Sequence, residues 1–175
     1  MIQYYFLLIF ILLAFYTDLT THKIPNVISM TALVMGWVFH TAMNGLNGLW
    51  FSFIGFFIAM FFTILLYSIR AVAAGDVKLF GAIGAWVGID VSIYILAYSI
   101  LFSLIFGICI LIFKKENWSR MKSVYVYILN IYIYRDIKFI KTFITNDNLQ
   151  FPFMIGVLPG VVATYIHLFL LKGVI

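Results

Sequence analysis

Charged side chains are scarce in this 175-residue chain: only 10% of the residues are Asp, Glu, Lys or Arg, whereas 65% are hydrophobic. A water-soluble core of this size cannot hide so much apolar surface, so the chain is predicted to be an integral membrane protein. Cysteine is scarcer still, because Cys109 is the only one. A single cysteine excludes an intrachain disulfide and a paired CxxC metal site.

Acidic residues are the rarest charged groups. The six are Asp18, Asp76, Asp90, Glu116, Asp136 and Asp147. Because a carboxylate is unfavourable in a bilayer, each of them is a candidate for function. The net charge of +5 is interpreted as a signal of membrane topology, since no nucleic-acid-binding motif accompanies it. No nucleic-acid partner is expected.

Apolar runs predict the fold class, an all-α polytopic membrane protein with about six transmembrane helices in a single domain, 1–175. The predicted spans are 2–17, 26–43, 49–69, 77–89, 91–113 and 151–171. Turn residues separate consecutive spans at NGLNG (44–48) and at GID (88–90). The first span is expected to stay in the mature protein, because MIQYYF has no basic region and no small-residue cleavage site precedes Asp18.

Basic residues predict the orientation. Ten of the eleven fall on one side of the predicted membrane, with Lys23 and Arg70, and only Lys172 falls on the other. The positive-inside rule assigns the larger group to the cytoplasm, so both termini are expected outside it. Asp18 and Asp76 then share the cytoplasmic face.

Two carboxyl groups brought close together share a proton, because both cannot ionise without strong repulsion. One can then act as a general base on water while the other, protonated, polarises a carbonyl group. The alternative for either aspartate alone is an ordinary interfacial charge. His22 lies four residues after Asp18, but Pro25 and the turn character of TTHK argue against a shared helix face, so no metal site is predicted.

Two segments resemble a known family: DLTTHKIPN (18–26) and AAGDVKL (73–79) are similar to the signature segments of type IV prepilin peptidases, which are GxGD intramembrane aspartic proteases. Phe151, Pro152 and Phe153 resemble the Pro-aromatic element that opens the family's last helix. Ala73 stands where the family pattern has its first glycine.

The resemblance implies an aspartic endopeptidase of the cell's inner (cytoplasmic) membrane that cleaves the basic leader of a prepilin or pseudopilin precursor. It implies that Asp18 and Asp76 are the catalytic pair. The supporting residues that it implies are Gly75, Lys78, Ile24, Pro25 and Asn26. Because the chain lacks the paired CxxC motifs of the larger members, it resembles the short form, for which leader cleavage without N-methylation is expected. No cofactor is expected.

Segment 114–150 is predicted to be cytoplasmic and interfacial, because VYVYILNIYIY (124–134) is too short to span a membrane. Arg135, Lys138 and Lys141 recur every three residues among isoleucines, as in an amphipathic helix bound to membrane lipids. The alternative for this segment is a lid or dock for the substrate leader.

Two other functions are open at this point. The aspartates could instead bind a proton or cation in a non-catalytic membrane scaffold or small transporter. The chain could also be a GxGD protease with different substrates, although it lacks the PAL element of the presenilin branch.

Overall fold

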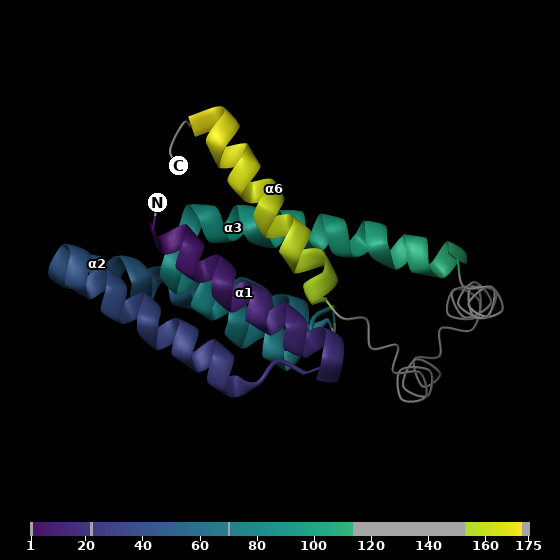
Figure 1. The fold of residues 1–175 in the computed structure, drawn as a ribbon, viewed down its shortest axis with the longest axis horizontal. Helices are drawn as coiled ribbons and strands as arrows, with labels where there is room; N and C mark the ends of the chain where they lie inside the picture. Colours follow the sequence, from purple (N-terminus) through teal and green to yellow (C-terminus); the bar gives the residue numbers. More distant parts are fainter. Residues whose placement is uncertain (1, 22, 70, 114–152, 173–175) are drawn as a thin grey trace, which may run out of the picture. The chain divides into compact units, whose positions relative to one another are not determined.

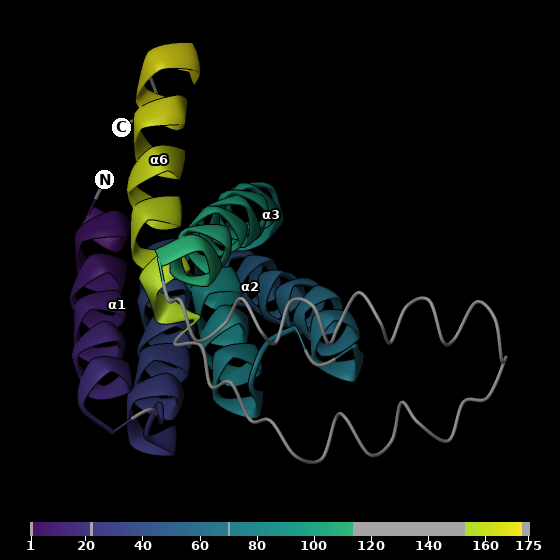
Figure 2. The same ribbon diagram turned by 90° about the vertical axis from the view of Figure 1, so that its right-hand side faces the viewer.

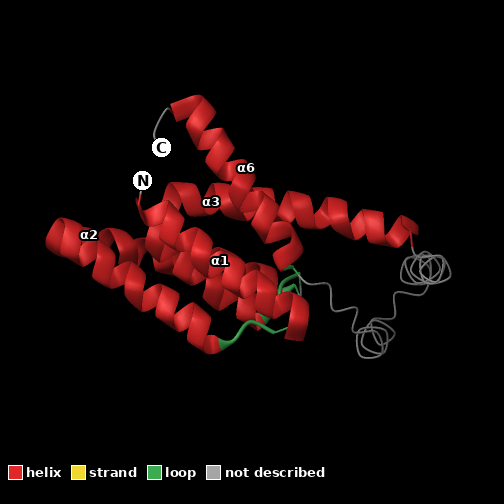
Figure 3. Cartoon of the chain, in the orientation of Figure 1, coloured by secondary structure: helices red, strands yellow, loops and turns green. Residues whose placement is uncertain are grey.

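The computed structural model describes residues 2–21, 23–69, 71–113 and 153–172. Its helices are α1 (Ile2–Thr21), α2 (Asn26–Ser68), α3 (Ala74–Phe113) and α6 (Met154–Lys172), shown in Figure 1 and, by secondary structure, in Figure 3. The predicted interfacial segment 114–150 lies outside the described residues. The chain divides into two compact units, one of residues 1–104 and 152–175 and one of 105–151. All contacts described below belong to the first unit.

The described part of the chain is all-helical, as predicted. Three helices are long and apolar enough to cross a membrane, namely α1, α2 and residues 74–109 of α3, and Met154–Leu170 of α6 forms a shorter apolar helix. Large apolar side chains such as Phe57 and Phe61 of α2 are more than half exposed, which suits a helix surrounded by lipid. The chain is therefore a membrane protein, while the number of about six spans stays a prediction.

Both long helices are interrupted by a glycine. A hydrocarbon core of about 30 Å needs only about 20 helical residues, whereas α2 has 43 residues and α3 has 40. Gly45 interrupts α2 with φ 59° and ψ −141°, and Gly88 interrupts α3 with φ 74° and ψ −172°. These dihedral angles are accessible mainly to glycine. The two breaks lie within the predicted turns NGLNG and GID.

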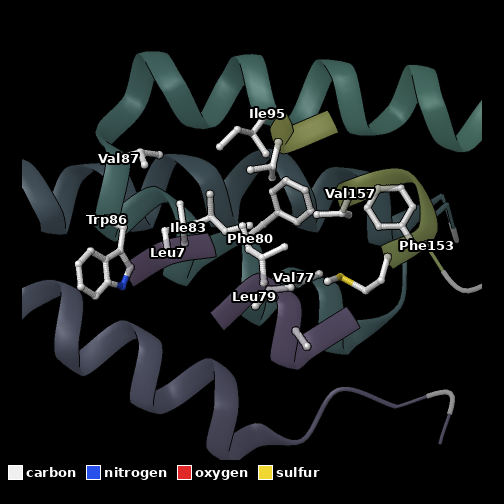
Figure 4. Packing of buried hydrophobic residues seen from close by; sticks show 14 of the residues in the cluster. Leu7, Val77, Leu79, Phe80, Ile83, Trp86, Val87, Ile95, Phe153 and Val157 are labelled. Atoms are coloured by element: carbon white, nitrogen blue, oxygen red, sulfur yellow. The ribbon is translucent and has the colours of Figure 1, made fainter. Parts of the chain in front are cut away.

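Residues 74–87 of α3, named the central segment here, form the core of the first unit. Phe80, Ile83 and Trp86 are almost fully buried, and Figure 4 shows them among side chains from the other helices. A helix that is apolar on all sides needs neighbours on all sides. The face of α1 that is buried consists of Leu7, Ile11, Ala14 and Asp18.

Small residues let the helices approach closely. A Cβ on Gly84 of the central segment would collide with the backbone carbonyl of Gly55 in α2. Gly156 and Gly160 of α6 lie equally close to Ser103 and Ser99 of α3. Gly84, Gly156 and Gly160 thus serve close helix packing, whereas Gly88 marks the break in α3.

The break at Gly88 leaves the last carbonyl groups of the central segment without partners in their own helix. Side chains from α2 replace those partners. The Ser52 hydroxyl donates to the Ala85 oxygen at 2.6 Å, and His40 Nε2 donates to the Trp86 oxygen at 2.8 Å. His40 is 4% exposed, so it is a packed, hydrogen-bonded residue of α2. The carbonyl groups at this helix end thereby have hydrogen-bond donors from a neighbouring helix.

Candidate active site

Asp18 lies in the last turn of α1 and is buried, with 8% of its surface exposed. It continues the buried face of Leu7, Ile11 and Ala14, so the same periodicity that packs α1 also turns this carboxyl group inward. The helix was expected to end near residue 17, and that boundary is wrong. The hydroxyls of Thr20 and Thr21 donate to the carbonyl oxygens of Tyr16 and Thr17 at 3.0 and 2.8 Å. The polar residues that end the apolar run therefore do not end the helix.

Asp76 lies in the first turn of α3 and is buried, with 4% of its surface exposed. Its Oδ2 accepts a hydrogen bond from the backbone N–H of Ala73 at 2.9 Å, while the Asp76 N–H donates to the Ala73 oxygen at 3.1 Å. This reciprocal pairing across three residues is the carboxylate half of a capping box. The first turn of α3 thus fixes the orientation of the carboxyl group.

The Ala73 side chain is exposed, and its contribution here is the backbone N–H. The replacement of the family's first glycine by alanine therefore leaves this hydrogen bond in place.

The two aspartates come together at one end of the first unit. Figure 2 shows the last turn of α1, the start of α2 and the start of α3 at the same end of the ribbon. The two buried carboxyl groups thus belong to helix ends that lie together. Both lie in apolar surroundings, where repulsion between two carboxylates is only weakly screened. The arrangement can therefore hold one proton between two acids, with one group acting as acid and the other as base.

The supporting residues predicted from the sequence lie in the same place. A Cβ on Gly75 would be 3.3 Å from the Ile24 Cβ, so the turn before α2 packs directly on the start of α3. Lys78 Nζ donates to the Asn26 Oδ1 at 2.8 Å. Pro25, with φ −60° and ψ 135°, precedes α2, and its carbonyl accepts from the Ile28 N–H at 3.1 Å. The two signature segments are thus in contact, although about fifty residues separate them.

The last helix packs beside the central segment one turn beyond Asp76. The rings of Phe153 and Phe80 lie 6.1 Å apart, centroid to centroid, and Figure 4 shows the pair. The Phe153 carbonyl accepts from the N–H groups of Gly156 and Val157 and so begins α6. Phe151 and Pro152, the rest of the predicted Pro-aromatic element, lie outside the described residues.

The described residues contain no group of three or more His, Cys, Asp and Glu side chains that could hold a metal ion. His22 lies outside the described residues. The described groups at this end of the unit include two carboxyl groups, an exposed ammonium and backbone N–H groups.

Sequence reasoning missed two contacts here. The bond from the Ala73 N–H to Asp76 has a local signal, an acidic side chain at the third position of the helix. The bond between Lys78 and Asn26 has none, because it depends on how α2 and α3 pack.

Comparison with protein families gives a match to the type IV leader peptidase family over residues 5–108, more than half of the chain. The matched region contains Asp18, Asp76 and both signature segments. Comparison with curated proteins and with solved structures gives no match. The family match, together with the contact between the two signature segments, leads to one conclusion: the chain belongs to the type IV leader peptidase family.

Proposed function

We propose that the chain is an intramembrane aspartic endopeptidase that removes the basic leader of type IV prepilin-like proteins. The observation that supports this most strongly is the burial of Asp18 at the end of α1 and of Asp76 at the start of α3, two helix ends that lie together. Six acidic residues occur in the whole chain, and a buried pair of carboxyl groups in a membrane protein is unfavourable unless it is used. Membership of a leader peptidase family supplies the class of reaction.

The proposed reaction is the hydrolysis of one peptide bond by a water molecule between the two acids. The ionised carboxylate takes a proton from the water, whose oxygen forms a bond to the carbonyl carbon. The protonated carboxyl group donates a hydrogen bond to the carbonyl oxygen and stabilises its developing charge. Proton transfer to the peptide nitrogen then lets the carbon–nitrogen bond break, releasing an amine and a carboxylic acid.

The proposed surroundings follow from the same assignment. The chain is a single peptidase domain in the inner membrane, with about six spans and both termini outside the cytoplasm. The side bearing Asp18, Lys23 and Asp76 faces the cytoplasm, as the distribution of basic residues supports. The partners are a prepilin or pseudopilin precursor and the surrounding lipids. The precursor's basic leader then stays on the side where the two acids lie.

Co-expression with a pseudopilin precursor tests this function. Intact-mass spectrometry of the precursor should show loss of the leader when the peptidase is present, with a new N-terminus at one defined bond. Omitting the peptidase is the control for cleavage by host enzymes. A scaffold or a proton or cation transporter predicts an intact precursor in both cultures, and that result would contradict the proposal.

A further inference from the structure

The hydrogen bond between Lys78 and Asn26 occupies a distinctive place in the first unit. Lys78 is the exposed exception among residues 76–87 of the central segment, which are otherwise buried. Its ammonium donates to the Asn26 side chain at 2.8 Å across two different helices. Lys78 follows Asp76 by two residues, and Asn26 is the first residue of α2. The bond therefore joins the start of α3, which carries Asp76, to the start of α2.

The start of α2 is in turn closely connected to Asp18. α1 ends at Thr21, and the Thr21 hydroxyl donates to the Lys23 carbonyl oxygen at 3.1 Å. Only a few residues then lead to Asn26. No side chain caps the start of α2, where Pro25 is the N-cap, so the Asn26 amide oxygen is available for Lys78. Fixing Asn26 against Lys78 therefore limits how far the end of α1 can move from the start of α3.

The second contact between these segments is apolar and small. Gly75 packs against Ile24 with no side chain of its own, so this contact alone leaves room for the segments to slide. A directional bond with a charged donor adds the geometric restraint that the apolar contact lacks.

We propose that Lys78 and Asn26 are positioning residues, which hold the Asp18-bearing and Asp76-bearing segments at the separation that the acid pair needs. This inference rests on the proposed function. It differs from two simpler roles for Lys78, a charge that favours ionisation of a nearby carboxylate and a lipid anchor, because those roles do not involve Asn26. Small displacements of catalytic groups are expensive, since about 1 Å can lower a rate about a hundredfold.

The test compares leader cleavage by Lys78→Met, Asn26→Leu and the double variant, using purified protein in lipid nanodiscs and a synthetic precursor. Each single variant should lower kcat about tenfold to a hundredfold with KM changed less than about threefold, because substrate binding is not what the bond controls. The double variant should be no slower than the slower single variant, because either change already removes the bond. The pH of maximum cleavage should not move.

Asn26→Asp is the conservative variant and should keep kcat within about threefold of the unmodified protein. It retains an acceptor oxygen for the ammonium, and a carboxylate suits the first turn of a helix. Asn44→Leu makes the same change of side chain near the other end of this part of α2 and should leave cleavage unchanged. If Asn26→Leu does not accumulate in the membrane, Asn26→Ser replaces it. The serine side chain is too short to reach the Lys78 ammonium, and serine is a residue that starts helices well.

Several results would overturn the inference. They are full activity of Asn26→Leu or Asn26→Ser, a shifted pH profile for Lys78→Met with normal Asn26 variants, and losses that multiply in the double variant.

A distance measurement adds a readout that does not require turnover. Spin labels at Thr20→Cys and Ala71→Cys, in a Cys109→Ser background, should give a broader distance distribution in Lys78→Met than in unmodified Lys78. An unchanged distribution contradicts the inference, whereas absence of cleavage by the unmodified enzyme contradicts the proposed function instead.

Discussion

The backbone groups at the two ends of the central segment find their hydrogen-bond partners in different ways. At its end, before Gly88, the carbonyl groups of Ala85 and Trp86 accept hydrogen bonds from Ser52 and His40. At its start, the carboxyl group of Asp76 accepts a hydrogen bond from the backbone N–H of Ala73, and a second buried acid, Asp18, lies at the neighbouring end of α1. One end uses a hydroxyl group and an imidazole of another helix, and the other uses carboxyl groups.

This difference indicates that the polar groups at the Gly88 end serve stability, whereas those at the Asp76 end serve chemistry. The donors at the Gly88 end match the carbonyl oxygens that they meet, so those hydrogen bonds contribute to stability. A second carboxyl group at the Asp76 end adds repulsion in a poorly screened environment, which stability alone does not favour. Changes at the Gly88 end should therefore lower stability without affecting leader cleavage. Changes to the acids should abolish leader cleavage without lowering stability.

The largest loss of stability is expected for Gly88→Ala. The backbone at position 88 has a conformation that favours glycine, and the new methyl group would collide with the ring of Phe51. The free energy of unfolding should fall by about 3 kcal/mol or more, because backbone strain and displacement of the ring add together. Titration with SDS in mixed micelles measures this change. A loss below that for Gly45→Ala would contradict the steric part of the explanation.

A smaller loss is expected for His40→Phe, which keeps a ring between Phe39 and Phe51 but removes the donor to the Trp86 oxygen. Leaving one buried carbonyl without its partner should lower the free energy of unfolding by about 1–3 kcal/mol in the same titration. Leader cleavage per folded molecule should stay within about twofold. A loss of cleavage without loss of stability would show that the Gly88 end takes part in the chemistry.

The smallest effect is expected for Gly45→Ala. Gly45 has φ 59°, but a Cβ there would meet no atom within 4 Å. Only the backbone penalty remains, so the free energy of unfolding should fall by about 1–2 kcal/mol. Compared with Gly88→Ala, this variant separates strain in the backbone from collision with a neighbour. Equal losses in the two variants would mean that Phe51 moves aside without penalty.

Local patterns in the sequence predicted much of the fold. NGLNG and GID gave the positions of both helix breaks, because glycine-containing turns interrupt apolar runs there. The end of α1 was misjudged, because hydropathy falls after residue 17 while the hydroxyls of Thr20 and Thr21 bond back to the preceding turn. The helix therefore continues beyond the point where the apolar run ends.

The candidate site was predictable where it rests on short motifs and not where it rests on packing. Asp18 and Asp76 stood out because acids are rare in an apolar chain. The bond from Lys78 to Asn26 and that from His40 to the Trp86 carbonyl join residues 52 and 46 positions apart. Each depends on the register between helices, which single-helix patterns do not specify. The catalytic role of the two acids stays a prediction for experiment to decide.

Mass spectrometry of a pseudopilin precursor incubated with Asp18→Asn or Asp76→Asn tests the central proposal most directly. Asn keeps the size of Asp but can neither take a proton from water nor donate one as an acid, so each variant should fold, insert and leave the precursor intact. The double variant should be no worse than either single one, because the two groups act together. Asp90→Asn, at an exposed position beside the Gly88 break, is the matched control and should release the leader as the unmodified protein does. Substantial release by either Asp18→Asn or Asp76→Asn at matched expression would contradict the assignment of an aspartic peptidase.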